Sequence, residues 1–432
     1  MAAGYYQAAL TDQLGAFELT VRRLPARRGF LIAAGLRQAA EYLLDGFRFG
    51  ADDIEYLRAL PQFARVPSGF FEALRNLRFT GDLFAVPEGT PVFPGEPLAI
   101  VRGPMIEAQI PETYLLSTFS FQTLVATKAA RVTAVAEGRG VVEFGTRRAH
   151  SPQAGVLAAR AAYIGGCIGT SNVLAGKRYG IPVYGTAAHS WVQAFPSEQE
   201  AQRALQKLLG EQSVFLVDTY DTVEGVRRAA ALGRPLWGVR LDSGDLAALA
   251  RAARSILDAA GLQDAKIMAS GDLNEYRIQE LCAAGAPIDS FGVGTDLATS
   301  ADAPALAAVY KLVETERKGE KRFPAKFSAD KITVPGMKQI YRFADHDLIA
   351  RADESVDVKG AEPLLRPVIV CGRLAEPLPD VKQSRAYAAD RLRSLPEKHR
   401  RLADAEPYPV EYSRGLQELL ENARRKLEGA HA

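Results

Sequence analysis

The sequence predicts an α/β fold with a barrel of parallel strands, and two features of its 432 residues carry that prediction. From residue 213 onward, strands alternate with helices through short connections, which indicates right-handed βαβ units around a parallel sheet. At least six strands also end in polar or glycine-rich residues. In a barrel, the carboxyl ends of all strands build one active-site face, whereas an open doubly wound sheet gathers ligands only near one crevice. We therefore favour the barrel.

Composition limits the classes of function. With 47% hydrophobic residues, the chain can bury one large core and a second one. Lys and Arg total 53 against 51 for Asp and Glu, a net charge of +2, so we expect no nucleic-acid or membrane partner, and any anion site must be built locally. The three cysteines form no CxxC pair, which argues against a structural zinc and favours a reducing, cytoplasmic location. We find no signal peptide and no run of about eighteen apolar residues.

Residues 1–111 predict a separate, mixed α/β domain. Residues 15–25 alternate apolar and polar positions as a strand does, and residues 30–46 begin as a strand and continue with helical spacing. Two short amphipathic helices follow at 52–60 and 69–77. A proline-punctuated set of strands over 84–104 completes the domain.

Residues 112–345 predict the barrel, and residues 346–432 predict strands and helices that pack on the other domains. A long helix begins near residue 112, and short strands are expected at 141–144 and 181–184. The regular part then alternates strand and helix, with strands at 213–220, 236–243, 266–272 and 289–295 and helices at 223–233, 245–261 and 274–285. A strand over 307–314 and a final strand near 343 follow, with Lys326, Lys331 and Lys338 around a turn, where we expect most lysines to face solvent.

Residues 141–190 hold the densest group of chemically active residues. Arg147 and Arg148 stand where a strand passes into a loop, and the planar arginine fork suits phosphate or carboxylate, although such a pair can also be merely solvated. Gly169 to Asn172 resemble a helix start, whose free N–H groups favour anions. His189, placed just past a strand end that carries Thr186, is a candidate acid, base or nucleophile.

Later strands end in further candidates. These are Asp218, then Arg240 and Asp242, then Ser270, Gly271 and Asp272, then Gly292, Gly294 and Thr295. Each motif alone is weak, but their recurrence at successive strand ends favours one shared site that binds phosphates. At single positions, interpretations without a role in ligand binding stay open. In these, Asp218 caps the next helix, Cys167 is a packed small residue, and Lys177 and Arg178 are solvated.

At these motifs the chain resembles the nicotinate phosphoribosyltransferase family. The resemblance extends from AAGYY near the start to YPVEYS near the end. It is most specific in the segments EFGTRRAHSP, GTSNVLAG, GTAAHSW, VRLDSGDL, ASGDLNEYRI and FGVGT. It implies the type II phosphoribosyltransferase fold, an incomplete α/β barrel with an N-terminal α/β sandwich domain. It also implies a homodimer with sites at its interface, the cofactors Mg²⁺ and ATP, and the substrates nicotinate and phosphoribosyl pyrophosphate.

The resemblance further implies roles for the matching residues. His189 would carry a phosphoryl group from ATP, and Phe144 would stack on the pyridine ring. Arg147 or Arg148, together with Ser171, would face the nicotinate carboxylate. The residues that would face phosphoribosyl pyrophosphate are Arg240, Asp242, Gly271, Asp272, Gly292 and Gly294.

Ser171 favours the acid over the amide as substrate. Related nicotinamide phosphoribosyltransferases have an aspartate here, which accepts a hydrogen bond from an amide but repels a carboxylate. Family members also have an upstream stretch similar to TDLYQLT before the methionine of MAAGYY, whose tyrosine stacks on nicotinate in the partner's site. This sequence begins at Met1 without it, so we expect the natural chain to begin further upstream.

Three other functions remain as alternatives. Quinolinate phosphoribosyltransferase shares the barrel but needs a larger basic cluster and no phosphorylated histidine. Nicotinamide phosphoribosyltransferase would need the aspartate that Ser171 replaces. A binding protein without turnover is the third, because fold alone does not give function.

Overall fold

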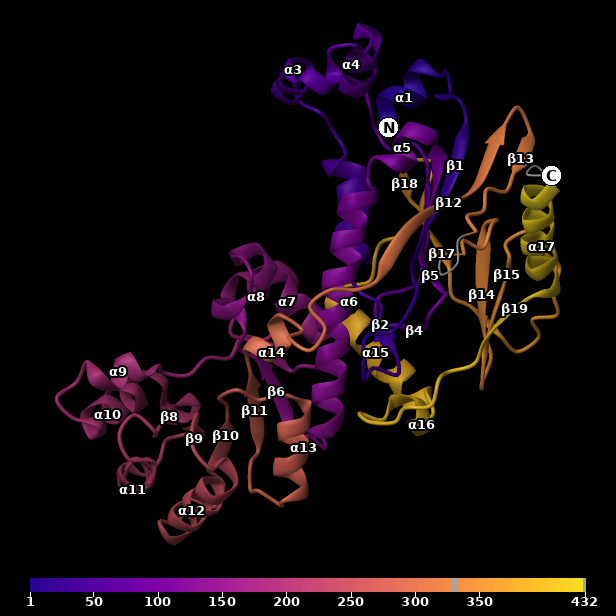
Figure 1. Cartoon of the computed structure of the whole chain (residues 1–432). Coiled ribbons are helices and arrows are strands. Elements are labelled where there is room, and N and C mark those ends of the chain that lie inside the picture. Colours follow the sequence, from indigo (N-terminus) through magenta and orange to yellow (C-terminus); the bar gives the residue numbers. More distant parts are fainter. Residues whose placement is uncertain (328–331, 430–432) are drawn as a thin grey trace. The chain divides into compact units, whose positions relative to one another are not determined.

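The computed structural model describes residues 1–327 and 332–429, and the chain falls into two compact units (Figure 1). The first unit joins the segments Met1–Thr123, Ala305–Pro379 and Asp390–Ala432. The second joins Leu124–Pro304 and Asp380–Ala389. The division of the chain at residues 111 and 345 stays a prediction.

The first unit is built on a seven-stranded antiparallel sheet with the order β13-β12-β1-β5-β3-β17-β18. Its strands are β1 Leu14–Val21, β3 Asp82–Ala85, β5 Pro97–Pro104, β12 Ala308–Arg317, β13 Glu320–Arg322, β17 Arg366–Val370 and β18 Arg373–Leu374. A four-stranded sheet in the order β16-β14-β15-β19 contains β14 Lys338–Arg342, β15 Asp347–Arg351, β16 Glu362–Pro363 and β19 Val410–Tyr412. The strands β2 Leu31–Ile32 and β4 Pro91–Val92 form a separate pair. The strand expected over 15–25 is therefore confirmed as β1.

Short helices complete the first unit, among them the two that the amphipathic patterns predict. The helices are α1 Ala2–Gln7, α2 Leu36–Glu41, α3 Ala51–Ala59, α4 Ser68–Arg75, α5 Met105–Gln109, α16 Glu397–Arg400 and α17 Arg414–Gly429. Two further helices, α6 Glu112–Val135 and α15 Val381–Ser394, each contribute residues to both units. Residues such as Leu19, Ile100 and Ile349 are fully buried in the core of the first unit.

One lysine of this region, Lys338, departs from the expectation that most of them face solvent. Lys338 is buried, and its ammonium group donates to Glu18 Oε2 at 2.5 Å and to the carbonyls of Val334 and Gly336. The buried carboxylate explains why this lysine does not face solvent. Lys326 is exposed as expected, and Lys331 lies outside the described residues.

The second unit holds a six-stranded sheet in which every neighbouring pair is parallel, in the order β7-β6-β11-β10-β9-β8. The strands are β6 Gly140–Glu143, β7 Gly169–Thr170, β8 Val214–Leu216, β9 Gly238–Leu241, β10 Lys266–Ala269 and β11 Ser290–Val293. Among the described residues β7 and β8 are its two edges, so the barrel is incomplete. The predicted fold class, an incomplete α/β barrel with an N-terminal mixed α/β part, is confirmed.

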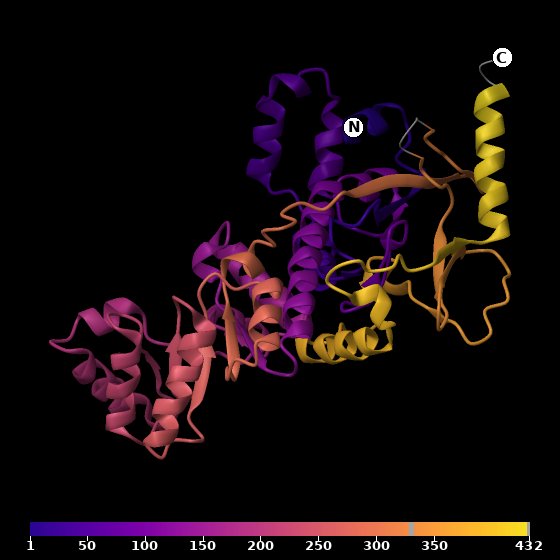
Figure 2. The ribbon, with the colours of Figure 1, turned by 60° about the horizontal axis from the view of Figure 1, so that its bottom comes forward.

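Helices connect these strands and flank them, as Figures 1 and 2 show. They are α7 Pro152–Ile164, α8 Val173–Tyr179, α9 His189–Gln193, α10 Glu198–Leu209, α11 Thr222–Leu232, α12 Leu246–Ala259, α13 Glu275–Ala283 and α14 Thr295–Ala298. Several begin at a side chain that accepts hydrogen bonds from the first turn, as Asn172, Asp221, Asp245 and Asn274 do. Each such cap fixes the residue at which a loop ends and a helix begins. The loop residues between the strand end and the cap are thereby held in position.

Two local expectations are wrong. Residues 181–184 form no strand, and only Val183 makes a single parallel bridge, to Thr170. Asp218 does not cap α11, because Asp221 accepts the backbone N–H of Glu224 at 2.9 Å. By contrast, Cys167 is fully buried, and Lys177 and Arg178 are exposed, as expected. Within the described residues, no helix has the length and apolar character needed to span a membrane.

Candidate active site

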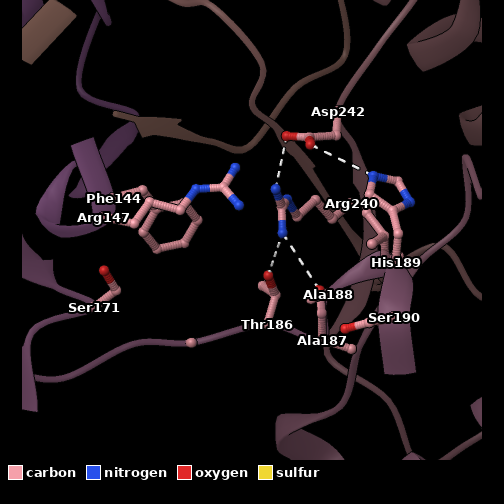
Figure 3. A pocket seen from close by; sticks show the side chains of 12 residues that line it. Phe144, Arg147, Ser171, Thr186, Ala187, Ala188, His189, Ser190, Arg240 and Asp242 are labelled. Atoms are coloured by element: carbon pink, nitrogen blue, oxygen red, sulfur yellow. Dashed lines mark hydrogen bonds and ion pairs between the residues drawn. The ribbon is translucent and has the colours of Figure 1, made fainter. Parts of the chain in front are cut away.

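The carboxyl ends of the strands in the second unit surround two adjoining cavities. The larger, of about 540 Å³, is lined by Phe144, Arg147, Ser171, Gly185, Thr186, Ala187, Ala188, His189, Ser190, Leu216, Arg240 and Asp242 (Figure 3). The smaller, of about 260 Å³, is lined by Phe144, Arg147, Arg148, Arg240, Asp242, Ser270, Gly271, Asp272, Gly292, Gly294 and Thr295. Four residues line both. The structure thus brings together fourteen of the candidates that the sequence analysis names, whereas Asp218 lines neither cavity and accepts a hydrogen bond from Ser243 Oγ instead.

Arg240, at the end of β9, connects the loops around the two cavities. Its Nε donates to Ser270 Oγ at 2.7 Å. One Nη donates to Thr186 Oγ1 at 2.6 Å and the other to Asp242 Oδ1 at 2.7 Å, as Figure 3 shows. The guanidinium carbon lies 5.7 Å from the centre of the Phe144 ring. With partners on three sides, the arginine is fixed in orientation, and its positive charge stands between the two cavities.

Asp242 is held in its charged form. Burial alone would raise the pKa of this carboxyl, but Arg240 and the hydrogen bonds from Ser270 and Arg240 outweigh burial and lower it. Ser270 Oγ lies 2.5 Å from Asp242 Oδ1. The carboxylate is therefore available near neutral pH as a hydrogen-bond acceptor for hydroxyl groups or as a metal ligand.

Phe144 forms a wall between the cavities because the neighbouring strand leaves room for its ring. Its N–H donates to the carbonyl of Val293 at 2.8 Å, which continues the pairing of β6 with β11. A Cβ atom at Gly292 would lie 2.6 Å from Cδ2 of the Phe144 ring. Glycine at this strand position is thus required by the close approach of the aromatic ring.

The two adjacent arginines occupy different places. Arg147 lines both cavities, and Figure 3 shows it on the same side of the larger cavity as Phe144 and Ser171. Arg148 lines only the smaller cavity. Both side chains are exposed, so they can move to meet an anion.

His189 lies at the opposite side of the larger cavity. It is the first residue of α9 rather than part of a loop after a strand, which differs from our expectation. Its Nδ1 lies 3.2 Å from Thr219 Oγ1, and its Nε2 lies 3.8 Å from Asp242 Oδ2 (Figure 3). With Thr219 holding one ring nitrogen, the other nitrogen points into the cavity beside a carboxylate.

Two tight loops form the floor of the smaller cavity. Gly271 has φ = +89°, and a Cβ atom there would lie 1.9 Å from the carbonyl oxygen of Asp242. Asp272 also adopts a positive φ, of 47°. Gly294 follows β11 and precedes the short helix α14. Loops of this kind present backbone N–H groups to bound anions.

Sequence reasoning missed two residues that shape the site. Glu143 is fully buried at the end of β6 and accepts hydrogen bonds from the Gly145 N–H and from Thr170 Oγ1. Burial raises the pKa of Glu143. Thr219, the partner of His189, is the other. The only feature of the sequence that points to these two residues is their position beside a candidate: Glu143 directly precedes Phe144, and Thr219 directly follows Asp218.

The arrangement suits the binding of a planar anion next to a phosphorylated sugar. The larger cavity offers an aromatic ring, an arginine and a serine hydroxyl, which together match a ring bearing a carboxylate. The smaller offers glycine loops, cations and carboxylates, which match phosphates and ribose hydroxyl groups. Arg240 lies between them, where charge would develop if a bond joining the two groups were exchanged.

Comparison with known proteins gives one consistent result. Three family models match the chain: the nicotinate phosphoribosyltransferase N-terminal domain over residues 1–120, the nicotinate phosphoribosyltransferase family over 140–329, and the C-terminal domain over 337–420. A nicotinate phosphoribosyltransferase of Mycobacterium tuberculosis is 43% identical over 426 residues, which cover 96% of this chain and 89% of that protein. One from Bacillus subtilis is 41% identical over 449 residues, with coverages of 96% and 91%.

A solved structure of the same family matches the chain over nearly its whole length. The crystal structure of human nicotinic acid phosphoribosyltransferase matches with a TM-score of 0.86 and 30% sequence identity. The match covers 98% of each chain.

Proposed function

Because the chain belongs to the nicotinate phosphoribosyltransferase family, we propose that it joins nicotinate to 5-phosphoribosyl 1-pyrophosphate. The products are nicotinate mononucleotide and pyrophosphate, and the reaction is a step of NAD salvage. The observation that carries the proposal is the pair of adjoining cavities with Arg240 between them. One cavity suits an aromatic acid and the other suits a phosphorylated sugar.

Nicotinate binds in the part of the larger cavity next to Phe144. The pyridine ring stacks on Phe144, and the carboxylate accepts hydrogen bonds from Arg147 and from the Ser171 hydroxyl. A hydroxyl can donate to a carboxylate, whereas an aspartate in its place would repel it. This contact selects the acid over the amide.

Phosphoribosyl pyrophosphate binds along Arg240 and into the smaller cavity. Backbone N–H groups near Gly271, Gly292 and Gly294 bind its phosphates, with Arg148 and Thr295 at the rim. Asp242 and Asp272 accept hydrogen bonds from the ribose hydroxyl groups. The ring nitrogen of nicotinate then lies in line with the anomeric carbon.

In the reaction, the lone pair of the pyridine nitrogen forms a bond to the anomeric carbon while the bond from that carbon to the pyrophosphate oxygen breaks. The electron pair of the broken bond leaves with pyrophosphate. Arg240, fixed by Thr186, Ser270 and Asp242, stabilises this departing negative charge without having to reorganise.

The residues of the site fit Mg²⁺ that arrives with the substrate phosphates. Among the described residues, no group of three His, Cys, Asp or Glu side chains could hold a metal ion by itself, and Mg²⁺ in phosphate sites is commonly held by one or two carboxylates together with phosphate oxygens. Asp242 and Asp272 line the cavity at which such oxygens would lie. When bound, the ion neutralises part of the pyrophosphate charge.

We further propose that ATP hydrolysis is coupled to the reaction through phosphorylation of His189. Nε2 of His189 faces the larger cavity near Asp242, and Thr219 holds Nδ1. Nε2 would attack the γ-phosphorus of ATP and release ADP, and water would later take up the phosphoryl group. The carboxylate of Asp242 stabilises the positive charge on the ring during the transfer.

The deciding experiment measures products formed by the purified 432-residue chain with phosphoribosyl pyrophosphate and Mg²⁺. Nicotinate, nicotinamide and quinolinate are offered in parallel, each with and without ATP. We expect a mononucleotide from nicotinate alone, formed faster with ATP, and no acceleration by ATP in His189→Ala. Product from quinolinate or nicotinamide would assign one of the alternative activities. Binding of phosphoribosyl pyrophosphate without any product would indicate a binding protein.

A further inference from the structure

Both loops of the smaller cavity lead directly into helices, and one buried lysine contacts both of those helices. The loop 270–274 leads into α13, whose first residue is Glu275, and the end of β11 leads into α14, whose second residue is Asp296. Lys128 belongs to the part of α6 that lies in the second unit, and its ammonium group contacts a carboxylate of each helix. Its Nζ is 2.6 Å from Glu275 Oε2 and 3.4 Å from Asp296 Oδ1.

The surroundings of this lysine are charged, with a buried centre made of Lys128, Glu275 and Arg131 and a rim where Asp296 and Asp302 are partly exposed. Lys128 is 1% exposed and Glu275 is 0% exposed. A third carboxylate, that of Asp302, lies 3.0 Å from the ammonium group, and Arg131 Nε lies 3.0 Å from the other oxygen of Glu275. Burial alone would lower the pKa of Lys128, but the carboxylates, Glu275 first, outweigh burial and raise it. The ammonium group therefore keeps its charge.

Stability alone does not account for this cluster. Removing Lys128, Arg131 and Glu275 from water costs free energy that their mutual attraction only partly returns. Apolar side chains of similar volume would fill the same space, and such replacements are often neutral or stabilising. What a buried ion cluster gives instead is fixed geometry, because each group has only one favourable position.

We propose that Lys128 is a positioning residue for the smaller cavity: through Glu275 and Asp296 it holds the two anion-binding loops at the separation that phosphoribosyl pyrophosphate requires. Lys128 lines neither cavity, so it acts only through these two carboxylates. The inference rests on the proposed function, which places the phosphates of that substrate in the smaller cavity. A shift of one loop by about 1 Å would misplace its N–H groups and lower activity strongly.

Asp296→Ala is the variant that separates positioning from simple charge. The substitution removes a negative charge next to a site for a polyanion, so electrostatics alone predicts tighter binding of the substrate. It also breaks the link from Lys128 to the loop at Gly294, so positioning predicts weaker binding. Asp302→Ala is the matched control, because it takes one carboxylate from the same lysine at a point beyond α14.

The experiment is calorimetric titration of the full chain and its variants with phosphoribosyl pyrophosphate and Mg²⁺, together with steady-state kinetics. For Asp296→Ala we expect Kd and KM for this substrate to rise by about tenfold, while KM for nicotinate stays unchanged. Lys128→Met, which loses both links, should show a larger rise. Asp296→Asn, the smaller change, should give an intermediate rise, and Asp302→Ala should stay within about twofold of the parent chain.

Each outcome decides between the possibilities. If Asp296→Ala and Asp296→Asn bind phosphoribosyl pyrophosphate as tightly as the parent chain, or more tightly, the positioning role is wrong while the proposed function stands. If the parent chain itself binds none, the proposed function fails, and this inference fails with it. Thermal unfolding of each variant shows whether a weaker signal reflects loss of the fold, which would lower the amount of active protein but leave KM unchanged.

Discussion

At the scale of single residues, the site depends on side chains that are held by others. Arg240 has a partner on each side of its guanidinium group, and those partners come from the loops at 186, 242 and 270. Lysine could not make this set of contacts, because it lacks the planar fork. Ser171 differs, since its hydroxyl lines the cavity and is available to a ligand.

Ser171→Asp is expected to lower kcat/KM for nicotinate by about tenfold or more, because it places a negative charge against the substrate carboxylate. The loss should appear mainly in KM for nicotinate. KM for phosphoribosyl pyrophosphate should change little, since Ser171 does not line the smaller cavity. Steady-state kinetics with each substrate varied in turn measures both quantities.

The control for this prediction is Ser171→Ala, which removes the hydroxyl without adding charge. It should cost less than the aspartate, because only one hydrogen bond to a charged group is lost. Equal losses in the two variants would show that charge is not the basis of the selection. Unchanged kinetics in Ser171→Asp would remove Ser171 from the site.

At the scale of elements, the close approach of β6 and β11 decides where the aromatic wall stands. Gly292 pairs with Val142, and the Phe144 ring lies over the glycine where a side chain would otherwise be. The strands therefore do more than present residues at their ends. Their register fixes the width of the space that Phe144 borders.

Gly292→Ala is expected to raise KM for nicotinate by about tenfold, because its Cβ would lie 2.6 Å from the Phe144 ring and must displace it. Phe144→Leu provides the second arm. If Gly292→Ala acts by moving the ring, it should raise KM for nicotinate much less in the Phe144→Leu background than in the parent chain. The effects of the two substitutions on KM should then not be additive. Kinetics of the four proteins measure this coupling, and full additivity would contradict the explanation.

Sequence patterns predicted these elements well wherever the period was regular. The strands and helices from 213 to 295 appear as expected. Short apolar strands that alternate with capped amphipathic helices are strong local patterns. The strand expected at 181–184 is wrong, because the neighbouring strand β7 has only two residues, and the segment pairs with it only through the N–H and the carbonyl of Thr170. The link from Thr219 to His189 spans thirty residues, and no local pattern encodes such a contact.

At the scale of the whole molecule, a chain of nearly balanced charge places several carboxylates where water does not reach. Glu96, in the first unit, is 1% exposed and lies near the fully buried Asp347. Arg342 pairs closely with Asp347, at 2.5 Å, and lies 3.9 Å from Glu96. One arginine is thus the cation for two buried acids. The negative charge of the farther acid, Glu96, is the less well neutralised.

Stability of the first unit should therefore fall as pH rises. Burial raises the pKa of Glu96 well above its ordinary value of 4.5. The hydrogen bond that protonated Glu96 donates to Asp347 and the repulsion between the two carboxylates raise it further, against the opposing effect of Arg342. The folded chain then binds a proton at Glu96 that the unfolded chain releases. The free energy of unfolding consequently falls from pH 4.5 upward, through the raised pKa of Glu96.

Glu96→Gln should remove this dependence, because glutamine resembles the protonated acid and can donate to Asp347. We expect the variant to gain thermal stability relative to the parent chain at pH 8 and to gain little or nothing at pH 5, with Tm changing by about 2–4 °C for each kcal/mol. Thermal unfolding of both proteins at the two pH values gives the difference, in which the titration of other groups cancels. Glu376→Gln, at an exposed glutamate of the same unit, is the control and should give the same small difference at both pH values. A Glu96→Gln variant that loses stability at pH 8 would show that the carboxylate, and not its protonated form, is what the folded unit holds.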